Sequence, residues 1–218
     1  MTATCPPPLQ QRLLSAVGID DCHIIHTPTD RPKISYHVKL SDSIKEAGDL
    51  LIRMVATYMK KSGEGPSFRG LVYCWTKDEV ERVAKKTGFS PFHADRPAQE
   101  QEASFKDWVT GKKFMICSSL LGCGVDVKGV RVVLHLGIPW LVLDFAQESG
   151  QAGQDGHFSQ SIVFAGTNEK EPSGEEDLYG GKTMQEWVLQ DTVCHRLALS
   201  LLLDNRQTTC LLLKGAAL

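Results

Sequence analysis

The sequence predicts an α/β protein with three layers, in which a mostly parallel sheet lies between helices. Short apolar runs alternate with amphipathic helical patterns from Arg69 to Phe164, as in repeated strand-and-helix units. The 218-residue chain is 42% hydrophobic and 23% charged, which are ordinary values for a core-forming domain. Further helices are expected to flank this sheet.

Three elements are expected before the alternating region. Leu9 to Val17 has the pattern of a short helix, Ile34 to Leu40 alternates like an edge or entry strand, and Ile44 to Lys60 has the pattern of a long amphipathic helix. All three can pack on the core of the same sheet.

The first strand-and-helix unit carries its own boundary signals. Leu71 to Trp75 is an apolar run that predicts a buried strand. Thr76 stands three residues before Glu79, the capping-box spacing for a helix start, and Gly88 marks the helix end. Further strands are expected at Phe89 to His93, Phe114 to Cys117, Val130 to Leu136 and Ser161 to Ala165, with helices from Pro97 to Gly111 and from Leu141 through Gln147.

The C-terminal part begins with an acidic segment at 167–182 that contains Gly and Pro and predicts an exposed loop or linker. One helix is expected after it, capped by Thr183 with Glu186 and running to about Asp204. The apolar run from Leu197 to Leu203 is either the core side of this helix or an exposed patch.

The charge, the apolar runs and the cysteines of the chain restrict which partners and which compartment are expected. The net charge is −2 and the pI about 6.4, so there is no global basic field, and a nucleic-acid role must rest on local contacts. The longest apolar runs are far shorter than the roughly 20 residues that cross a bilayer, so no membrane contact is expected. The N-terminus lacks the pattern of a secretory signal, and seven scattered cysteines fit a reducing, intracellular compartment.

Several short motifs occur in a fixed order along the chain. They are Thr2-Ala3-Thr4, Arg31-Pro32 followed by Ile34 to Val38, GLVYCWT from Gly70 to Thr76, the stretch from Ser118 to Pro139, and QESGQAGQDG from Gln147 to Gly156. In this order and spacing the chain resembles the RecQ-like ATP-dependent DNA helicases, from motif III through motifs IV, V and VI, over residues 2–165.

The resemblance implies the second RecA-like motor lobe of such a helicase. In this family two lobes clamp ATP and move 3′ to 5′ along one DNA strand, and the second lobe supplies DNA-backbone contacts and an arginine finger. The implied partner is single-stranded DNA, and the implied location is nuclear or otherwise intracellular. The implied parts are a lead-in at 1–40, a helicase C-terminal RecA-like domain at 41–166, an acidic loop at 167–182, and a truncated remnant of a helical and zinc module at 183–218.

ATP and Mg²⁺ are the cofactors that the resemblance implies, but the phosphate loop and the Mg²⁺-binding Asp-Glu pair belong to the first lobe, before motif III. Two local patterns imitate them. Gly180 to Thr183 ends like a phosphate loop, but Glu176 occupies its first glycine position, so we expect a loop that runs into a helix cap. Asp78-Glu79 lies in a first helical turn, where carboxylates favour the helix dipole. This chain alone is not expected to bind ATP productively.

Motif V offers candidate contacts to DNA and nucleotide. Ser118 and Ser119 at a strand end present hydroxyls and amides suited to a sugar-phosphate chain. Gly124 allows close approach of the backbone to a ligand, and the motif position of Asp126 implies a hydrogen bond to a ribose hydroxyl. The alternative is a tight connection between strands, with Asp126 as a turn residue.

Motif VI has glutamine at both arginine positions, Gln151 and Gln154. An arginine there would carry a fixed charge and a planar fork of donors, whereas glutamine forms hydrogen bonds without charge. An arginine finger is worth on the order of 10³ to 10⁵ in rate, so most of that contribution is expected to be lost. Gln147 and Gly150 keep their motif positions as implied nucleotide contacts. The alternative is a polar turn that touches no nucleotide.

Two further residues are implied DNA contacts. Thr76 ends motif IV, and His93 opens the His-Ala dipeptide that the family places near single-stranded DNA. The alternative for His93 is a hydrogen-bonded structural histidine.

The cysteines are not expected to carry chemistry. Cys74 at a strand end is expected to be a packed thiol. Cys194 and Cys210 resemble the start of the family's zinc module, but two thiolates cannot close a structural tetrahedral site, so zinc is not expected.

Three functions remain open on the sequence. The first is a motor lobe that neither hydrolyses ATP nor unwinds DNA by itself. The second is a non-catalytic module that binds single-stranded DNA weakly through Thr76, His93, Ser118 and Ser119. The third is a protein-interaction remnant that pairs with a separately encoded first lobe.

Overall fold

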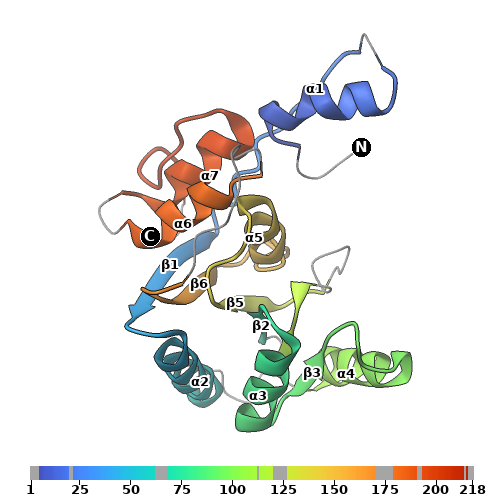
Figure 1. The fold of residues 1–218 in the computed structure, drawn as a ribbon, viewed down its shortest axis with the longest axis vertical. Coiled ribbons are helices and arrows are strands. Elements are labelled where there is room, and N and C mark those ends of the chain that lie inside the picture. Colours follow the sequence, from blue (N-terminus) through green and yellow to red (C-terminus); the bar gives the residue numbers. More distant parts are fainter. Residues whose placement is uncertain are drawn as a thin grey trace.

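The computed structural model describes residues 5–19, 22–61, 68–111, 113–119, 127–169, 179–190, 193–213 and 215. The predictions for Thr2-Ala3-Thr4, Gly124, Asp126 and most of the acidic segment fall outside these residues. The described residues form a parallel sheet with helices on both faces (Figure 1).

The strands are β1 (Ile34–Ser41), β2 (Arg69–Cys74), β3 (Ser90–Phe92), β4 (Phe114–Cys117), β5 (Val130–Leu136) and β6 (Ser159–Gly166). The helices are α1 (Pro7–Ala16), α2 (Ile44–Lys61), α3 (Lys77–Thr87), α4 (Ala98–Thr110), α5 (Val142–Ser149), α6 (Gly181–Leu189) and α7 (His195–Asp204).

The sheet has the strand order β1-β6-β5-β2-β4-β3, and each described pair of strands is parallel. The predicted fold class is therefore confirmed, with β1 at an edge of the sheet as expected. Because all these strands run in one direction, their carboxyl ends share one side of the molecule, here named the carboxyl edge. Their amino ends share the opposite side, the amino edge.

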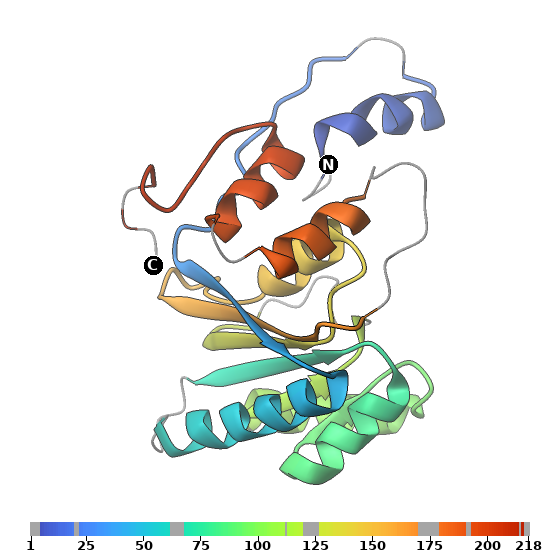
Figure 2. The same ribbon diagram turned by 60° about the vertical axis from the view of Figure 1, so that its left-hand side comes forward.

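Both faces of the sheet are buried, which explains the near-continuous apolar runs of the strands. Along β2 the side chains alternate between faces: Leu71 and Tyr73 pack with Trp108 of α4, whereas Val72 and Cys74 pack with α2 and α3. On the face opposite α2, the helices α5, α6 and α7 cover the half of the sheet formed by β1 and β6 (Figure 2). These layers form the predicted three-layer arrangement.

Helix α3 begins and ends as its sequence predicts. The Thr76 hydroxyl accepts from the Glu79 amide at 3.2 Å, and the Glu79 carboxylate accepts from the Thr76 amide at 3.2 Å. Gly88 ends the helix in the left-handed conformation, with φ 77°. Asp78 lies in the first turn, as expected for a carboxylate that favours the helix dipole.

The single helix predicted from Thr183 to Asp204 is wrong, because the chain forms two helices there, α6 and α7. Gln190 is extended after α6, and the Trp187 indole nitrogen donates to the carbonyl of His195 at 2.6 Å. Both helices bury apolar residues in the same cluster. Packing against the sheet decides this break, and no local signal in the sequence marks it.

The cap predicted at Thr183 is also wrong. Gly180, with φ 82°, precedes the helix, which begins at Gly181, so Thr183 lies inside the first turn. A Cβ on Gly180 would lie 2.5 Å from Leu202 and 2.7 Å from Val142. The left-handed backbone and the close packing therefore both explain why a glycine stands directly before α6.

The apolar run from Leu197 to Leu203 lies in α7 and supplies core side chains, with Leu199 and Leu203 buried. In the part of the chain that the structure describes, no helix is long and apolar enough to cross a membrane.

Candidate functional site

The predicted DNA contacts follow the ends of three neighbouring strands. Thr76 lies just after β2, His93 follows β3, and Ser118 and Ser119 follow β4. Since β2, β4 and β3 are adjacent and parallel, the structure brings these four residues to the carboxyl edge. In open α/β sheets this is the edge at which ligands bind.

The side chains at this edge differ in what they offer a ligand. Ser119 is exposed, and Ser118 is half-buried with its amide donating to the Phe92 carbonyl at 3.1 Å. Thr76 is also exposed, although its hydroxyl already accepts the capping hydrogen bond of α3. Ser119 and Thr76 are therefore the exposed residues of the three, and the Thr76 hydroxyl also serves as a helix cap.

His93 is buried, with 6% of its surface exposed. Its Nε2 lies 3.0 Å from a carboxylate oxygen of Glu81, which also pairs with Arg96. The hydrogen bond from His93 is the largest cause that lowers the pKa of Glu81 from its ordinary value. This geometry favours the structural alternative, in which His93 joins β3 to α3, and a direct DNA contact stays a prediction.

Two cations at the carboxyl edge belong to none of the motifs in the sequence. Lys77, next to Thr76, pairs with Asp95, and Arg96 pairs with Glu81 and with Glu100 at 2.8 Å. Their positions directly after the ends of β2 and β3 were the available signal. Positive charge at this edge can contact a phosphate chain.

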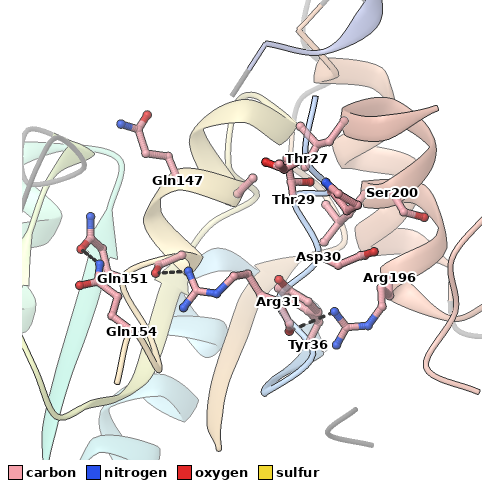
Figure 3. Close-up of a pocket in the computed structure, with 15 residues that line it drawn as sticks. Thr27, Thr29, Asp30, Arg31, Tyr36, Gln147, Gln151, Gln154, Arg196 and Ser200 are labelled. Atoms are coloured by element: carbon pink, nitrogen blue, oxygen red, sulfur yellow. Dashed lines mark hydrogen bonds between the residues drawn. The ribbon is translucent and has the colours of Figure 1, made fainter. Parts of the chain in front are cut away.

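Motif VI lies at the amino edge, away from the predicted DNA contacts. The amide of Gly153 donates to the carbonyl of Val130, the first residue of β5, at 2.9 Å. Gln151 and Gln154 point toward one another, and the Gln154 amide nitrogen donates to the Gln151 amide oxygen at 3.0 Å (Figure 3). Gln147 is exposed near the end of α5.

Arg31 holds the motif VI loop from the lead-in segment. Its guanidinium donates to the carbonyl of Gly150 at 2.8 Å (Figure 3). It also donates to the carbonyl of Ala152 at 2.7 Å. A Cβ on Gly150 would lie 2.9 Å from the Ala146 carbonyl oxygen, so the loop also needs a glycine there. The sequence indicated Arg31 only as part of a motif, without a partner.

Asp155 fastens the same loop to β5. Its two carboxylate oxygens accept from the Arg131 guanidinium at 2.9 and 2.6 Å, and one accepts from the Gly129 amide at 3.2 Å. The hydrogen bond from Arg131 is the main cause that lowers the pKa of Asp155 to about 2. The loop backbone is therefore fixed without a charge at Gln151 or Gln154.

A cavity of about 340 Å³ lies between motif VI, the lead-in segment and α7. It contains Arg31 and also Arg196, which donates to the Arg31 carbonyl at 3.1 Å and the Ile34 carbonyl at 2.8 Å and lies over the Tyr36 ring. Burial, followed by nearby Asp204, raises the pKa of Asp30 in this cavity. Both guanidinium groups thus donate to main-chain carbonyls, and the motif VI pair is neutral.

The cysteines have structural surroundings. Cys74 is buried, and burial raises the pKa of its thiol, as expected for a packed side chain. The sulfurs of Cys194 and Cys210 lie 3.4 Å apart. Among the described residues, no group of three or more His, Cys, Asp or Glu side chains is placed to hold a metal ion.

The helicase conserved C-terminal domain family matches residues 49–156, from α2 through motif VI. The chain carries a helicase C-terminal domain. Its curated relatives include the ATP-dependent DNA helicase Q-like 2 of Arabidopsis thaliana, 29% identical over 170 residues, which are 75% of this chain and 24% of that protein. The putative ATP-dependent DNA helicase Q1 of Caenorhabditis elegans is 24% identical over 217 residues, 92% of this chain and 33% of that protein.

These relatives confirm the resemblance to RecQ-like helicases. The RecQ helicase of Haemophilus influenzae is 26% identical over 75% of this chain and 26% of its own length. The chain spans about a quarter to a third of the length of these relatives.

Solved structures support the fold. The structure of Dbp5 of S. cerevisiae, bound to RNA and ADP BeF3, is similar to this one with a TM-score of 0.66 and 15% identity. The match covers 86% of this chain and 48% of the Dbp5 chain. The DEAD-box helicase Mss116, bound to ssRNA and UDP-BeF, matches 87% of this chain and 43% of its own with a TM-score of 0.64 and 14% identity. At these identities the likeness shows the fold alone, which is RecA-like.

Proposed function

We propose that this chain is the second motor lobe of a RecQ-like 3′-to-5′ DNA helicase, that it contacts the backbone of single-stranded DNA, and that by itself it neither hydrolyses ATP nor unwinds DNA. The observation that carries the proposal is the separation of two edges. Residues suited to phosphate contact gather at the carboxyl edge, while motif VI at the amino edge keeps its backbone shape around a neutral pair.

The carboxyl edge supports the DNA contact. Ser119 offers an exposed hydroxyl beside half-buried Ser118, and Thr76 is exposed nearby. Lys77 and Arg96 are cations at this edge, and a phosphate would compete with their carboxylate partners Asp95 and Glu100. Hydroxyls, amides and cations are the groups that proteins use to hold a nucleic-acid backbone.

The amino edge supports the lack of ATPase activity. Gln151 and Gln154 are hydrogen-bonded to each other, and neither carries a charge to meet the one that develops on a transferred phosphoryl group. Arg31 lies beside them but donates to two carbonyls of the loop. ATP and Mg²⁺ would therefore need a first lobe that supplies the phosphate loop and the Mg²⁺ ligands.

The test is ATP hydrolysis by the purified chain with single-stranded DNA present. The wild type and the double variant Gln151→Arg, Gln154→Arg are both expected to release phosphate at the rate of a buffer blank. DNA-stimulated hydrolysis that disappears in an Asp126→Ala variant would overturn the proposal.

A first lobe, joined to this one or encoded separately, would complete the motor. Co-purification of a protein that contains a phosphate loop, with ATPase activity restored in the mixture, is the expected sign of a separate lobe. A function on DNA also implies a nuclear or otherwise intracellular location, which imaging of a tagged chain would check.

A further inference from the structure

Two exposed tryptophans stack on each other at the carboxyl edge. The ring centroids of Trp75 and Trp140 lie 4.9 Å apart with an interplanar angle of 26°. Trp75 directly follows β2, and Trp140 lies in the connection between β5 and α5. Their exposed fractions are 37% and 59%, which is unusual for the largest apolar side chain. A pair of this kind on a surface is typical of a binding site.

The backbone beneath the pair fixes its orientation. Gly137 has φ 92°, and a Cβ at this position would lie 3.2 to 3.3 Å from three atoms of the Trp75 ring. Trp75 therefore lies flat between Gly137 on one side and Trp140 on the other. Trp140 is 59% exposed, so the face of its ring that is turned away from Trp75 is open to solvent.

The pair shares a cavity with a predicted DNA contact. Ser119 lines the same cavity, of about 110 Å³, as both tryptophans, and Thr76 is the next residue after Trp75. A strand of nucleic acid held by Thr76 and Ser119 would thus pass beside the exposed ring of Trp140.

The charges of this cavity select the part of a nucleotide that fits it. Asp144 and Glu148 line it, and Glu148 pairs with buried His135 at 3.1 Å. Burial, followed by Glu148, raises the pKa of Asp144. Carboxylates disfavour a phosphate here. An uncharged base can stack on the ring, and its amino group can donate a hydrogen bond to a carboxylate.

We propose that Trp75 and Trp140 form a stacking platform for one base of single-stranded DNA, beside the backbone contacts of Thr76 and Ser119. This inference rests on the DNA-binding part of the proposed function. Stacking on an aromatic face tolerates any base, as a motor domain that moves along a strand requires. A cationic side chain is the competing occupant, because one indole face suffices for a cation–π contact and carboxylates line the cavity. The base is favoured by the backbone contacts proposed for Thr76 and Ser119 beside the same cavity.

The experiment compares two labelled probes at low salt: a short oligodeoxycytidine and an abasic chain of the same length. The wild type should bind the oligodeoxycytidine more tightly, with quenching of tryptophan fluorescence. Trp140→Ala should weaken oligodeoxycytidine binding by about fivefold or more and leave abasic binding unchanged. Trp140→Phe should restore much of the affinity, because it keeps a ring. The salt dependence should be the same in all variants, since stacking neutralises no phosphate.

Phe158 provides a matched control, because it is also 59% exposed but precedes β6 at the amino edge. Phe158→Ala should bind both probes like the wild type. Equal wild-type affinity for the two probes would overturn the platform and leave backbone binding intact. Failure to bind either probe would overturn both proposals, and quenching by a lysine-rich peptide without quenching by DNA would assign the tryptophans to a protein partner.

Discussion

Single residues outside the two glutamines hold the motif VI loop in shape. Arg31 binds the carbonyls of Gly150 and Ala152, and Asp155 binds Arg131 through both carboxylate oxygens. The neutral pair of Gln151 and Gln154 therefore sits in a loop whose backbone is fixed from two sides. The backbone shape of this loop therefore does not depend on a charge at Gln151 or Gln154.

The Asp155 ion pair predicts an acid-dependent contribution to stability. The pKa of Asp155 is lowered to about 2 from an ordinary 3.8. Because the folded value is the lower one, the pair stabilises the fold fully above about pH 4, and this contribution is lost as the pH falls toward 2. Asp155→Asn should lower the free energy of unfolding in urea by about 1 kcal/mol at neutral pH.

The difference between wild type and Asp155→Asn should shrink as the pH falls through that window. Glu100→Gln is the control, because Glu100, in α4, forms a solvent-accessible ion pair with Arg96 just before that helix and should change stability little when replaced. A wild type and Asp155→Asn that lose stability in parallel would contradict the assignment of this pair.

For single residues, the sequence predicts the chemical type of a side chain at a site better than it predicts which residues contact one another. It placed Ser119 just after a strand, as the structure has it, while the role of Gln151 and Gln154 stays a prediction. It could not indicate that Arg31 holds Gly150, because 119 positions separate them. The same limit hid the contact of Trp75 with Trp140, since only the fold brings residues from separate connections together.

Among the elements, α3 links the stability of the fold to the carboxyl edge, because its N-cap residue, Thr76, is also a predicted DNA contact. Thr76→Ala removes a hydrogen bond to the Glu79 amide and should lower the free energy of unfolding by about 1 kcal/mol. Thr57→Ala is the matched control: Thr57 lies inside α2, and its hydroxyl donates to the Arg53 carbonyl at 2.9 Å. That change should be neutral or slightly stabilising. Equal losses from both changes would mean that the capping box adds nothing.

The predicted elements succeeded where local signals were strong. The strands were found because parallel strands buried on both faces leave continuous apolar runs, and α3 because its cap and its terminal glycine are both local. The C-terminal helix failed because its break at Gln190 is imposed by packing of α6 and α7 on one cluster. The predicted division at 41–166 stays a prediction beside the family match at 49–156.

On the scale of the whole molecule, the parallel sheet puts the two halves of the proposed activity at opposite edges. The carboxyl edge gathers Thr76, Ser118 and Ser119 with nearby cations, and the amino edge carries motif VI, braced by the lead-in segment and α7. The lead-in is tied down further by Asp204, which accepts from the Thr29 amide and hydroxyl at 3.0 and 3.1 Å. This arrangement suits a lobe that holds a strand on one side while another lobe closes on its ATP-facing side.

The most direct test of this account is a salt titration of single-stranded DNA binding by the purified chain. Affinity should be measurable at low salt and should fall as salt rises, with a log–log slope of about −0.7 for each phosphate that a cation such as Lys77 or Arg96 neutralises. Affinity that is independent of salt, or no binding at low salt, would contradict the claim that the carboxyl edge of this helicase domain contacts a DNA backbone.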